Sequence, residues 1–290
     1  MQSLSGKVAF ITGASRGIGR AIAERLAREG VHCVIASKTV APHPKLEGTI
    51  GEVAEACSAL GAEAMAVPVD VRRPHEIARA VDDAVARFGR LDIAIHNAGA
   101  LWWKPIKDTP LDKFDLVHEV NARGAYALAH AALPHLRASR GHFIAMSPPV
   151  EPESLNGTLA GKTAYMMSKL GMTMVAMGVS LEEPAIAANG LWPETLVESA
   201  ATRNFGIGSP DLWYKAELMA EAVFELVRLP EGERPRGQGL LMLEFMRTRG
   251  YTDFTPWRCN PAVEPPSLLM TSKVRAGGKE RADGAELGRT

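Results

Sequence analysis

The chain alternates short apolar segments with longer amphipathic ones, and this alternation constrains the fold more than any other feature. Over the first 245 residues, each apolar run is followed by a segment with helical periodicity. Strands separated by helices form parallel sheets that helices cover on both faces. The sequence therefore predicts an α/β fold built on one doubly wound parallel sheet.

The boundaries follow from the apolar runs and the Gly and Pro residues between them. We expect a single domain over residues 1–270, followed by a polar, glycine-containing and disordered tail over 271–290. The predicted strands are 8–11, 32–36, 64–69, 91–96, 142–145, 186–192 and 240–243. The predicted helices are 18–28, 46–60, 74–88, 111–133, 163–181 and 210–228.

Composition narrows the class of protein. The 290 residues include 33 basic and 33 acidic side chains, so the formal net charge is zero. A nucleic-acid or anionic-membrane binder would show a basic bias, and no apolar run is long enough to span a membrane. The three scattered cysteines and eight histidines show no metal-ligand spacing, so we expect no metal site. The amino terminus shows no signal-peptide pattern, and we expect a cytoplasmic protein.

A glycine-rich turn follows the first predicted strand. Gly13, Gly17 and Gly19 have the spacing G-x-x-x-G-x-G, and a helix begins within the turn. Without side chains, the backbone can approach a pyrophosphate, and the helix amino terminus supplies N–H groups and positive potential. The alternative is a bare strand-to-helix turn. With the alternating elements, the turn predicts a Rossmann-type nucleotide-binding domain.

Tyr165 and Lys169 form the second informative pair. A spacing of four places both side chains on one face of a helix. A free tyrosine hydroxyl titrates near ~10, and a neighbouring ammonium is expected to lower that pKa. The pair can therefore move a proton to or from a substrate oxygen. With a nucleotide held at the glycine turn, this chemistry suggests hydride transfer.

Together these motifs resemble the classical short-chain dehydrogenase/reductase family, over roughly residues 5 to 245. The resemblance is closest to the hydroxysteroid dehydrogenase-like branch, through Ala36–Leu46, Ser147-Pro148-Pro149 and Leu191-Trp192-Pro193. Some members of that branch carry a C-terminal sterol-carrier domain, which we do not expect here. The family motifs found are Thr12–Gly19, Asp70, Asn97-Ala98-Gly99, Asn121, Ser147, Tyr165 and Lys169.

The resemblance implies four catalytic roles. Tyr165 is the expected general acid in reduction and base in oxidation. Lys169 is expected to lower the Tyr165 pKa and to bond the nicotinamide ribose. Ser147 would hold the substrate oxygen, and Asn121 would order a water in a proton relay. The alternatives are a turn or cap role for Ser147 and a helix-bend role for Asn121.

The cofactor choice rests on charge. NAD sites usually place an acid after the second strand, where this chain has Ser37 and Lys38. Arg16 and Lys38 favour a 2′-phosphate, so we expect NADP, although both could be ordinary surface charges. The expected cofactor-binding residues are Gly13, Ser15, Arg16, Gly17, Ile18, Gly19, Lys38, Asp70, Val71, Asn97, Ala98, Gly99, Tyr165, Lys169, Pro193 and Thr195.

The chain departs from the family pattern in two places. The family usually has Pro-Gly after the sixth strand, where this chain has Pro193-Glu194, so Glu194 must turn away from the pocket or face it. The threonine expected to bond the nicotinamide carboxamide is displaced, with Thr195 and Ser199 as candidates. Extra residues at 148–161 are expected in the pocket wall, with a substrate lid at about 194–209. Trp102, Trp103 and Trp192 could add aromatic surface, or could be core or interface residues.

The leading hypothesis is an NADP-dependent oxidoreductase that interconverts a secondary alcohol and a carbonyl on a small apolar, lipid-like or steroid-like substrate. A second hypothesis is a catalytically silent NADP-binding sensor or scaffold. A third is reduction of a carrier-bound 3-oxoacyl chain, which the single basic residue of the lid, Arg203, makes less favoured. We expect a homodimer or homotetramer.

Overall fold

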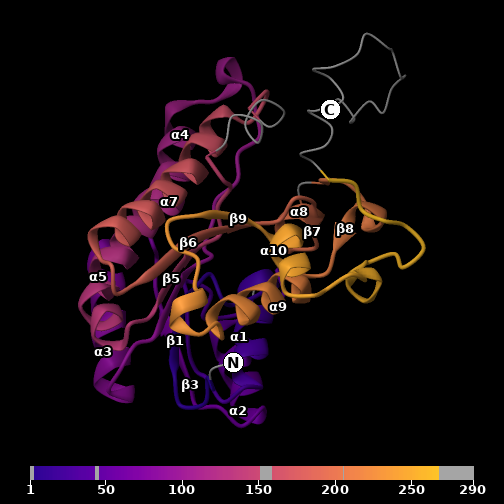
Figure 1. Cartoon of the computed structure of the whole chain (residues 1–290). Coiled ribbons are helices and arrows are strands. Elements are labelled where there is room, and N and C mark those ends of the chain that lie inside the picture. Colours follow the sequence, from indigo (N-terminus) through magenta and orange to yellow (C-terminus); the bar gives the residue numbers. More distant parts are fainter. Residues whose placement is uncertain (1–2, 43–45, 151–158, 205, 268–290) are drawn as a thin grey trace.

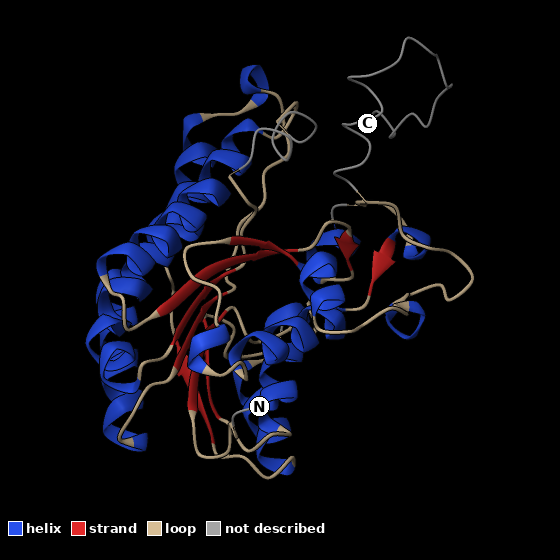
Figure 2. Cartoon of the chain, in the orientation of Figure 1, coloured by secondary structure: helices blue, strands red, loops and turns tan. Residues whose placement is uncertain are grey.

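The parallel sheet predicted from the sequence is present in the computed structural model, which describes residues 3–42, 46–150, 159–204 and 206–267. Within these residues, seven strands pair in parallel in the order β3-β2-β1-β4-β5-β6-β9. Figure 2 shows the sheet in red with helices on either side of it. The strand order reverses beside β1, which pairs with β2 on one side and β4 on the other. The strands are β1 (Val8–Thr12), β2 (His32–Ser37), β3 (Ala64–Pro68), β4 (Ile93–His96), β5 (His142–Ala145), β6 (Ala187–Trp192) and β9 (Gly239–Leu241).

Helices cover both faces of the sheet, so the predicted Rossmann-type fold is confirmed (Figure 1). One face carries α1 (Gly17–Ala27), α2 (Ile50–Ala59) and α9 (Ala216–Val227). The other carries α3 (Pro74–Phe88), α4 (Leu111–His118), α5 (Gly124–Ser139) and α7 (Thr163–Glu182). The described residues also form α8 (Ala200–Asn204), α10 (Met242–Thr248) and a two-stranded parallel sheet of β7 (Leu196–Val197) and β8 (Trp213–Tyr214).

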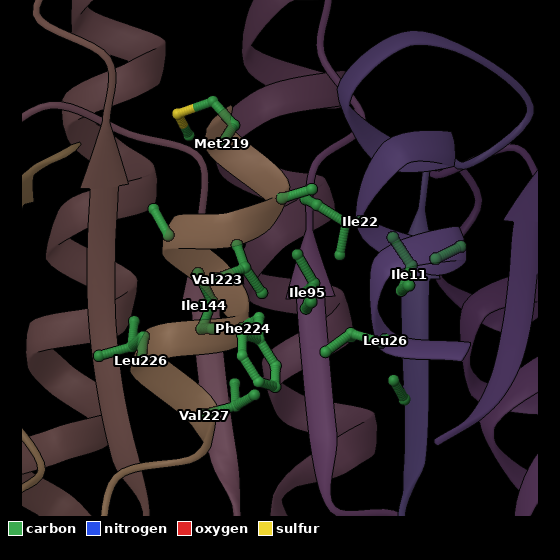
Figure 3. Close-up of a cluster of buried hydrophobic side chains, with 14 of the residues drawn as sticks. Ile11, Ile22, Leu26, Ile95, Ile144, Met219, Val223, Phe224, Leu226 and Val227 are labelled. Atoms are coloured by element: carbon green, nitrogen blue, oxygen red, sulfur yellow. The ribbon is translucent and has the colours of Figure 1, made fainter. Parts of the chain in front are cut away.

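The core consists of two apolar layers, one on each face of the sheet. Neighbouring strand residues point to opposite faces, so Phe10 packs in the α3/α5/α7 layer and Ile11 in the α1/α9 layer. Figure 3 shows the second layer, where Leu26 of α1 and Phe224 of α9 lie over the strands. Burying a side chain of this size contributes about 1.5–3 kcal/mol. These layers hold the carboxyl ends of β1 and β4 in fixed positions.

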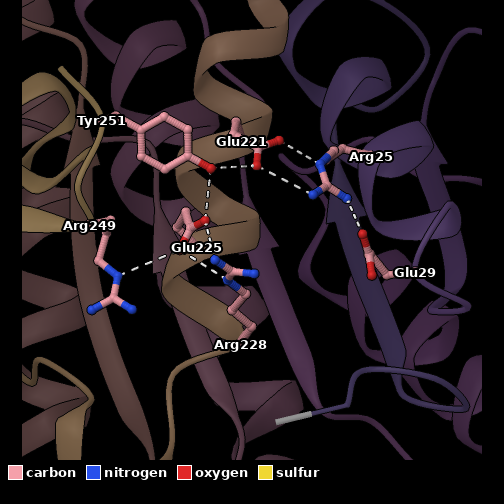
Figure 4. A network of polar contacts seen from close by, with 7 residues as sticks. All are labelled: Arg25, Glu29, Glu221, Glu225, Arg228, Arg249 and Tyr251. Atoms are coloured by element: carbon pink, nitrogen blue, oxygen red, sulfur yellow. Dashed lines mark hydrogen bonds and ion pairs between the residues drawn. The ribbon is translucent and has the colours of Figure 1, made fainter. Parts of the chain in front are cut away.

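A polar network joins α1, α9 and the segment after α10 (Figure 4). The fully buried Glu225 carboxylate accepts hydrogen bonds from Arg228 at 2.6 Å and from the Tyr251 hydroxyl at 2.9 Å, with Arg249 at 3.5 Å. Arg25 bonds Glu221 at 2.6 Å. The network therefore anchors the chain after β9 to the Rossmann domain.

Several predicted boundaries were wrong, among them the start of the helix predicted over 46–60, which begins only at Ile50. The helix predicted over 111–133 is divided by a π-helical turn, Glu119–Arg123, and continues past Pro134 to Ser139. The helix predicted over 210–228 begins only at Ala216, because residues 210–214 form a 3₁₀ turn and β8. β9 ends at Leu241, where α10 begins without a sequence signal that we recognised. At residues 213–214, the pairing of β8 with β7 overrides the local helical pattern.

The expected tail at 271–290 lies outside the described residues, so its disorder and the boundary of the single domain stay predictions. Of the wall segment 148–161, residues 151–158 also lie outside them. Among the helices that are described, none is both long and apolar enough to cross a membrane.

Candidate active site

One cavity of about 580 Å³ lies along the carboxyl ends of the central strands and brings the two sequence motifs together. Gly19, Ser147 and Asn121 are the predicted site residues that do not line it. The predicted residues that do line it are Gly13, Ser15, Arg16, Gly17, Ile18, Lys38, Asp70, Val71, Asn97, Ala98, Gly99, Tyr165, Lys169, Pro193 and Thr195.

The glycine turn has the geometry of a pyrophosphate-binding loop. Gly13 and Gly17 have positive φ angles of 66° and 55°. A Cβ on Gly13 would lie 2.8 Å from the Ala98 backbone, and one on Gly19 would lie 2.6 Å from the Gly13 carbonyl oxygen. No side chain caps the amino terminus of α1. Its first N–H groups can therefore meet an anion, while Gly19 supports the turn from behind.

Asn97 and Thr12 hold this turn against β4. The Asn97 side-chain amide donates to the carbonyl oxygens of Thr12 and Gly13, both at 3.1 Å. The Thr12 hydroxyl accepts the N–H groups of Asn97 and Ala98, also at 3.1 Å. Asn97 thus braces the central strands, and Thr12 is a structural partner that the sequence reasoning missed.

His96 is a second residue that the sequence did not single out. Its Nδ1 lies 3.2 Å from the Thr12 hydroxyl, and its Nε2 lies 3.1 Å from the Val120 carbonyl oxygen. Burial, followed by the charge of Lys169, lowers the pKa of His96 to about 3. The ring is therefore neutral near pH 7, with Nε2 donating to Val120 and Nδ1 accepting from Thr12.

The end of the cavity beside the carboxyl end of β2 carries more cations than acids. Lys38 is exposed and lines the cavity, and it has no hydrogen-bond or ion-pair partner in the described ranges. Arg16 also lines it, but its guanidinium donates to the carbonyl oxygens of Glu47 at 2.7 Å and Gly48 at 3.1 Å. At the same end, Arg72 bonds the Asp70 carboxylate at 2.5 Å and holds the Asp70 pKa below its usual value.

Tyr165 and Lys169 lie at the other end of the cavity, one helical turn apart on α7. The Lys169 ammonium donates to the Met146 carbonyl oxygen at 2.7 Å and lies 6.0 Å from the centre of the Tyr165 ring. Burial lowers the pKa of Lys169 to about 8 and raises the pKa of Tyr165. The sequence predicted a lowered Tyr165 pKa. The direction is opposite because burial removes water from the phenolate, which disfavours the charged form.

Ser147 is turned away from the cavity. Met146 lines the cavity, and in an extended chain the next side chain points to the opposite face. The Ser147 hydroxyl is fully buried, lies 3.4 Å from the Ala145 carbonyl oxygen, and stands 2.9 Å from where a Cβ on Gly190 would lie. The expected contact between Ser147 and the substrate oxygen therefore has no support in this geometry.

Asn121 lies in the π-helical turn, behind the cavity wall. Its amide donates to the Ala100 carbonyl oxygen at 3.0 Å and to Ser168 at 2.8 Å, and its oxygen accepts the Ala100 N–H at 2.8 Å. A Cβ on Gly99 would lie 3.5 Å from the Asn121 oxygen and 3.7 Å from the Lys169 ammonium. Asn121 thus ties the loop after β4 to the helix that carries Tyr165.

Aromatic side chains border the Tyr165 end. Trp103 lines the cavity, and its ring meets the Tyr165 ring edge-on at 6.0 Å between centroids. Trp192 also lines the cavity, with the Lys169 ammonium 5.8 Å from its ring centre. Trp102 is not among the lining residues. Two of the three expected tryptophans therefore form an apolar wall beside the tyrosine.

The predicted lid borders the cavity and contains β7 and α8. Thr195 is buried, lines the cavity, and has a hydroxyl without a partner in the described part of the chain. Glu194 points away from the cavity, toward α10. Thr195 is the better placed candidate for the nicotinamide carboxamide, because the hydroxyl of the alternative, Ser199, is hydrogen-bonded to Thr202.

No described group of three or more His, Cys, Asp or Glu side chains could hold a metal ion.

Comparison with known proteins agrees with this geometry. A family model described as short chain dehydrogenase matches residues 7–204. Hydroxysteroid dehydrogenase-like protein 2 from Danio rerio is 38% identical over 92% of this chain, and the Homo sapiens protein of that name is 37% identical over 97%. The chain spans 63% and 68% of the length of these relatives, respectively. The resemblance to the hydroxysteroid dehydrogenase-like branch is confirmed.

Solved structures extend the comparison. A short chain dehydrogenase from Mycobacterium thermoresistibile is 36% identical, with a TM-score of 0.83, covering 91% of this chain and 95% of that chain. A Burkholderia cenocepacia short chain dehydrogenase in complex with NADP is 29% identical, with a TM-score of 0.70, covering 83% and 97%. Carveol dehydrogenase from Mycobacterium avium, in complex with NAD, is 24% identical with a TM-score of 0.70, covering 82% and 96%, and shares the fold.

Proposed function

The chain belongs to the short-chain dehydrogenase family of NAD(P)-binding oxidoreductases, and on that basis we propose that it is an NADP-dependent enzyme that interconverts a secondary alcohol and a carbonyl. The observation that carries the proposal is that the glycine turn and the Tyr165/Lys169 pair lie at the two ends of the same cavity. We propose a small, largely apolar substrate, because Trp103, Trp192 and Met146 line the cavity beside Tyr165.

The residues present fit a nicotinamide dinucleotide. The uncapped amino terminus of α1 can accept the pyrophosphate, and the missing side chain of Gly99 leaves space beside Lys169. The unpartnered Thr195 hydroxyl is available to a carboxamide. Such a cofactor, when bound, supplies or accepts the hydride.

Tyr165 supplies the proton in this proposal. Because burial raises its pKa, the phenol stays protonated at neutral pH and can donate to the oxygen of a carbonyl undergoing reduction. Lys169 is fixed through Met146, which leaves two ammonium hydrogens for a ribose hydroxyl and for the relay that restores the tyrosine proton. Asn121 and Ser168 keep the helix and the loop after β4 in register.

The proposed preference for NADP rests on Lys38, which is unpaired in the described ranges, and on the absence of an acid directly after β2. A cation at this position suits a 2′-phosphate, and an acid would suit a 2′-hydroxyl. Calorimetry with NADPH and NADH on the wild type and Lys38→Asp tests this preference. We expect tighter binding of NADPH and its reduction or reversal in the variant. Equal affinities in the wild type would refute the preference, and no binding of either nucleotide would refute the oxidoreductase itself.

A silent sensor is the second candidate, and Ser147 favours it, because one expected catalytic contact is missing from the cavity. A panel of apolar ketones and aldehydes with NADPH separates the two. Carbonyl reduction that is lost in Tyr165→Phe establishes the enzyme, whereas tight NADPH binding without turnover establishes the sensor. A carrier-bound 3-oxoacyl substrate is the third candidate, and thioesters belong in the same panel.

We also propose a homodimer or homotetramer assembled through α5 and α7. Tyr126, Met167, Met174 and Leu181 are large apolar side chains exposed on these two helices. Monomeric proteins rarely expose contiguous apolar patches of large area. Sedimentation of the wild type and Met174→Glu tests the assembly, and a wild-type monomer would contradict it.

A further inference from the structure

Glu194 lies between two residues of the cavity wall, yet its side chain reaches a different part of the fold. Pro193 and Thr195 line the cavity, whereas the Glu194 carboxylate is buried and accepts the Leu243 N–H at 2.7 Å and the Glu244 N–H at 3.3 Å. These N–H groups belong to the first turn of α10, which directly follows β9.

The carboxylate acts as a cap that comes from outside the helix. The first N–H groups of any helix lack partners within it, and Leu241 at the start of α10 offers no side-chain cap. Burial raises the pKa of Glu194, because a buried carboxylate loses the water that stabilises its charge. The hydrogen bonds from the two N–H groups partly offset this desolvation cost. The acid at position 194, where the family usually has glycine, is therefore explained by a link between β6 and α10.

The same C-terminal segment also holds the lid. The Lys215 N–H donates to the Trp257 carbonyl oxygen at 2.7 Å, and the Cys259 N–H donates to the Trp213 carbonyl oxygen at 3.1 Å, so residues 257–259 border β8. β8 in turn pairs with β7, which begins directly after Thr195. Thr195 is thus held on one side by the Glu194 cap and on the other by the lid sheet, and both are attached to the chain after β9.

We propose that Glu194 is a positioning residue: by capping α10 it fixes the wall residues Pro193 and Thr195, so that the unpartnered Thr195 hydroxyl meets the nicotinamide end of the cofactor. The inference rests on the proposed function, because a nicotinamide nucleotide must bind in the cavity. Glu194 itself does not touch the cofactor, and its effect is transmitted through the backbone.

The test compares wild type, Glu194→Ala, Glu194→Gln and the matched control Glu244→Gln. Glu244 is exposed on the same helical turn, and its backbone N–H, not its carboxylate, forms a hydrogen bond in the cap. Calorimetry measures the affinity for NADPH and for 2′,5′-ADP, which lacks the nicotinamide half. Amide hydrogen exchange in residues 242–248 reports on the cap without any requirement for activity. Glu194→Gln keeps one acceptor and guards against a folding defect in the alanine variant.

In Glu194→Ala we expect NADPH to bind about tenfold more weakly, the size expected for loss of hydrogen bonds to a charged group, with 2′,5′-ADP affinity unchanged. The rate of amide exchange in α10 of Glu194→Ala should rise by a similar factor. Glu194→Gln should give values between those of Glu194→Ala and the wild type, and Glu244→Gln should match the wild type. Unchanged NADPH affinity in Glu194→Ala, with a wild type that binds, overturns the positioning role alone. Equal losses for both nucleotides overturn it as well, and a wild type that binds neither overturns this inference together with the proposed function.

Discussion

Lys169 combines catalytic placement with a measurable cost to stability. The ammonium is buried, and desolvation lowers its pKa from 10.5 to about 8. At about 1.4 kcal/mol per pKa unit, holding the charged form in the folded protein costs about 3 kcal/mol near pH 7. A methionine at this position carries no charge and fills a similar volume. We therefore expect Lys169→Met to unfold at higher denaturant concentration than the wild type at pH 7, although the bond to Met146 is lost.

The dependence on pH isolates the lysine. Its folded pKa lies below its unfolded value, so between pH 8 and 10.5 the unfolded state binds more protons, and the Lys169 contribution to stability becomes more favourable as pH rises. The stability gap between Lys169→Met and the wild type should therefore narrow by about 2 kcal/mol from pH 7 to pH 9.5. Other titrating groups are common to both proteins and cancel in the difference.

Urea denaturation of the cofactor-free proteins at the two pH values measures this gap. Lys107→Met is the control, because Lys107 is exposed, and its gap to the wild type should be the same at both values. Carbonyl reduction should be lost in Lys169→Met and retained in the control. A Lys169 gap that is constant between pH 7 and pH 9.5, or that widens, would refute the account of Lys169 as a buried, desolvated ammonium.

Three further outcomes follow from the same structure. Ser147→Ala should change kcat by less than about threefold, because the Ser147 hydroxyl faces β6. Loss of a hydrogen-bond donor to the reacting oxygen would instead lower kcat by about 10²–10³. A loss of that size in steady-state assays would show that Ser147 contacts the substrate. His96 has a folded pKa of about 3, so below pH 6.5 the unfolded state binds a proton that the folded state does not. In urea titrations, the free energy of unfolding of the wild type should therefore fall by about 1.4 kcal/mol per pH unit relative to that of His96→Asn. Unfolding free energies of the two proteins that change in parallel with pH would contradict this. Glu225→Ala should destabilise the protein by about 3–5 kcal/mol, because it leaves Arg228 and Arg249 without the carboxylate that they face (Figure 4). A loss of less than about 1 kcal/mol in a denaturant titration would show that water replaces the carboxylate.

The parts of the site that sequence predicted are those set by local spacing. Gly13 lies between β1 and α1, and Gly17 and Gly19 lie in the first turn of α1. Their spacing along the chain is sufficient to place a tight turn at the carboxyl edge of the sheet. Tyr165 and Lys169 share a helix face because they are four residues apart. Alternation of strands and helices limits the topology in the same way.

Side-chain direction next to the strand ends required the tertiary structure. Ser147 and Met146 are adjacent, and the pairing of β5 with β6 decides which of the two reaches the cavity. Glu194 could have faced the cavity, and its direction depends on α10, which begins 48 residues later at Met242. Nothing in the local sequence around Glu194 encodes a partner so distant along the chain.

The sequence by itself determined the α/β fold class, the nucleotide-binding turn and the Tyr165/Lys169 pair, because each depends on residue type and on spacing within one element or between consecutive elements. Only the tertiary structure decided the direction of the Tyr165 pKa shift, the neutral state of His96, and the withdrawal of Ser147 from the cavity. These properties depend on burial and on partners far away in the chain. Desolvation and packing are set by the whole core rather than by neighbouring residues.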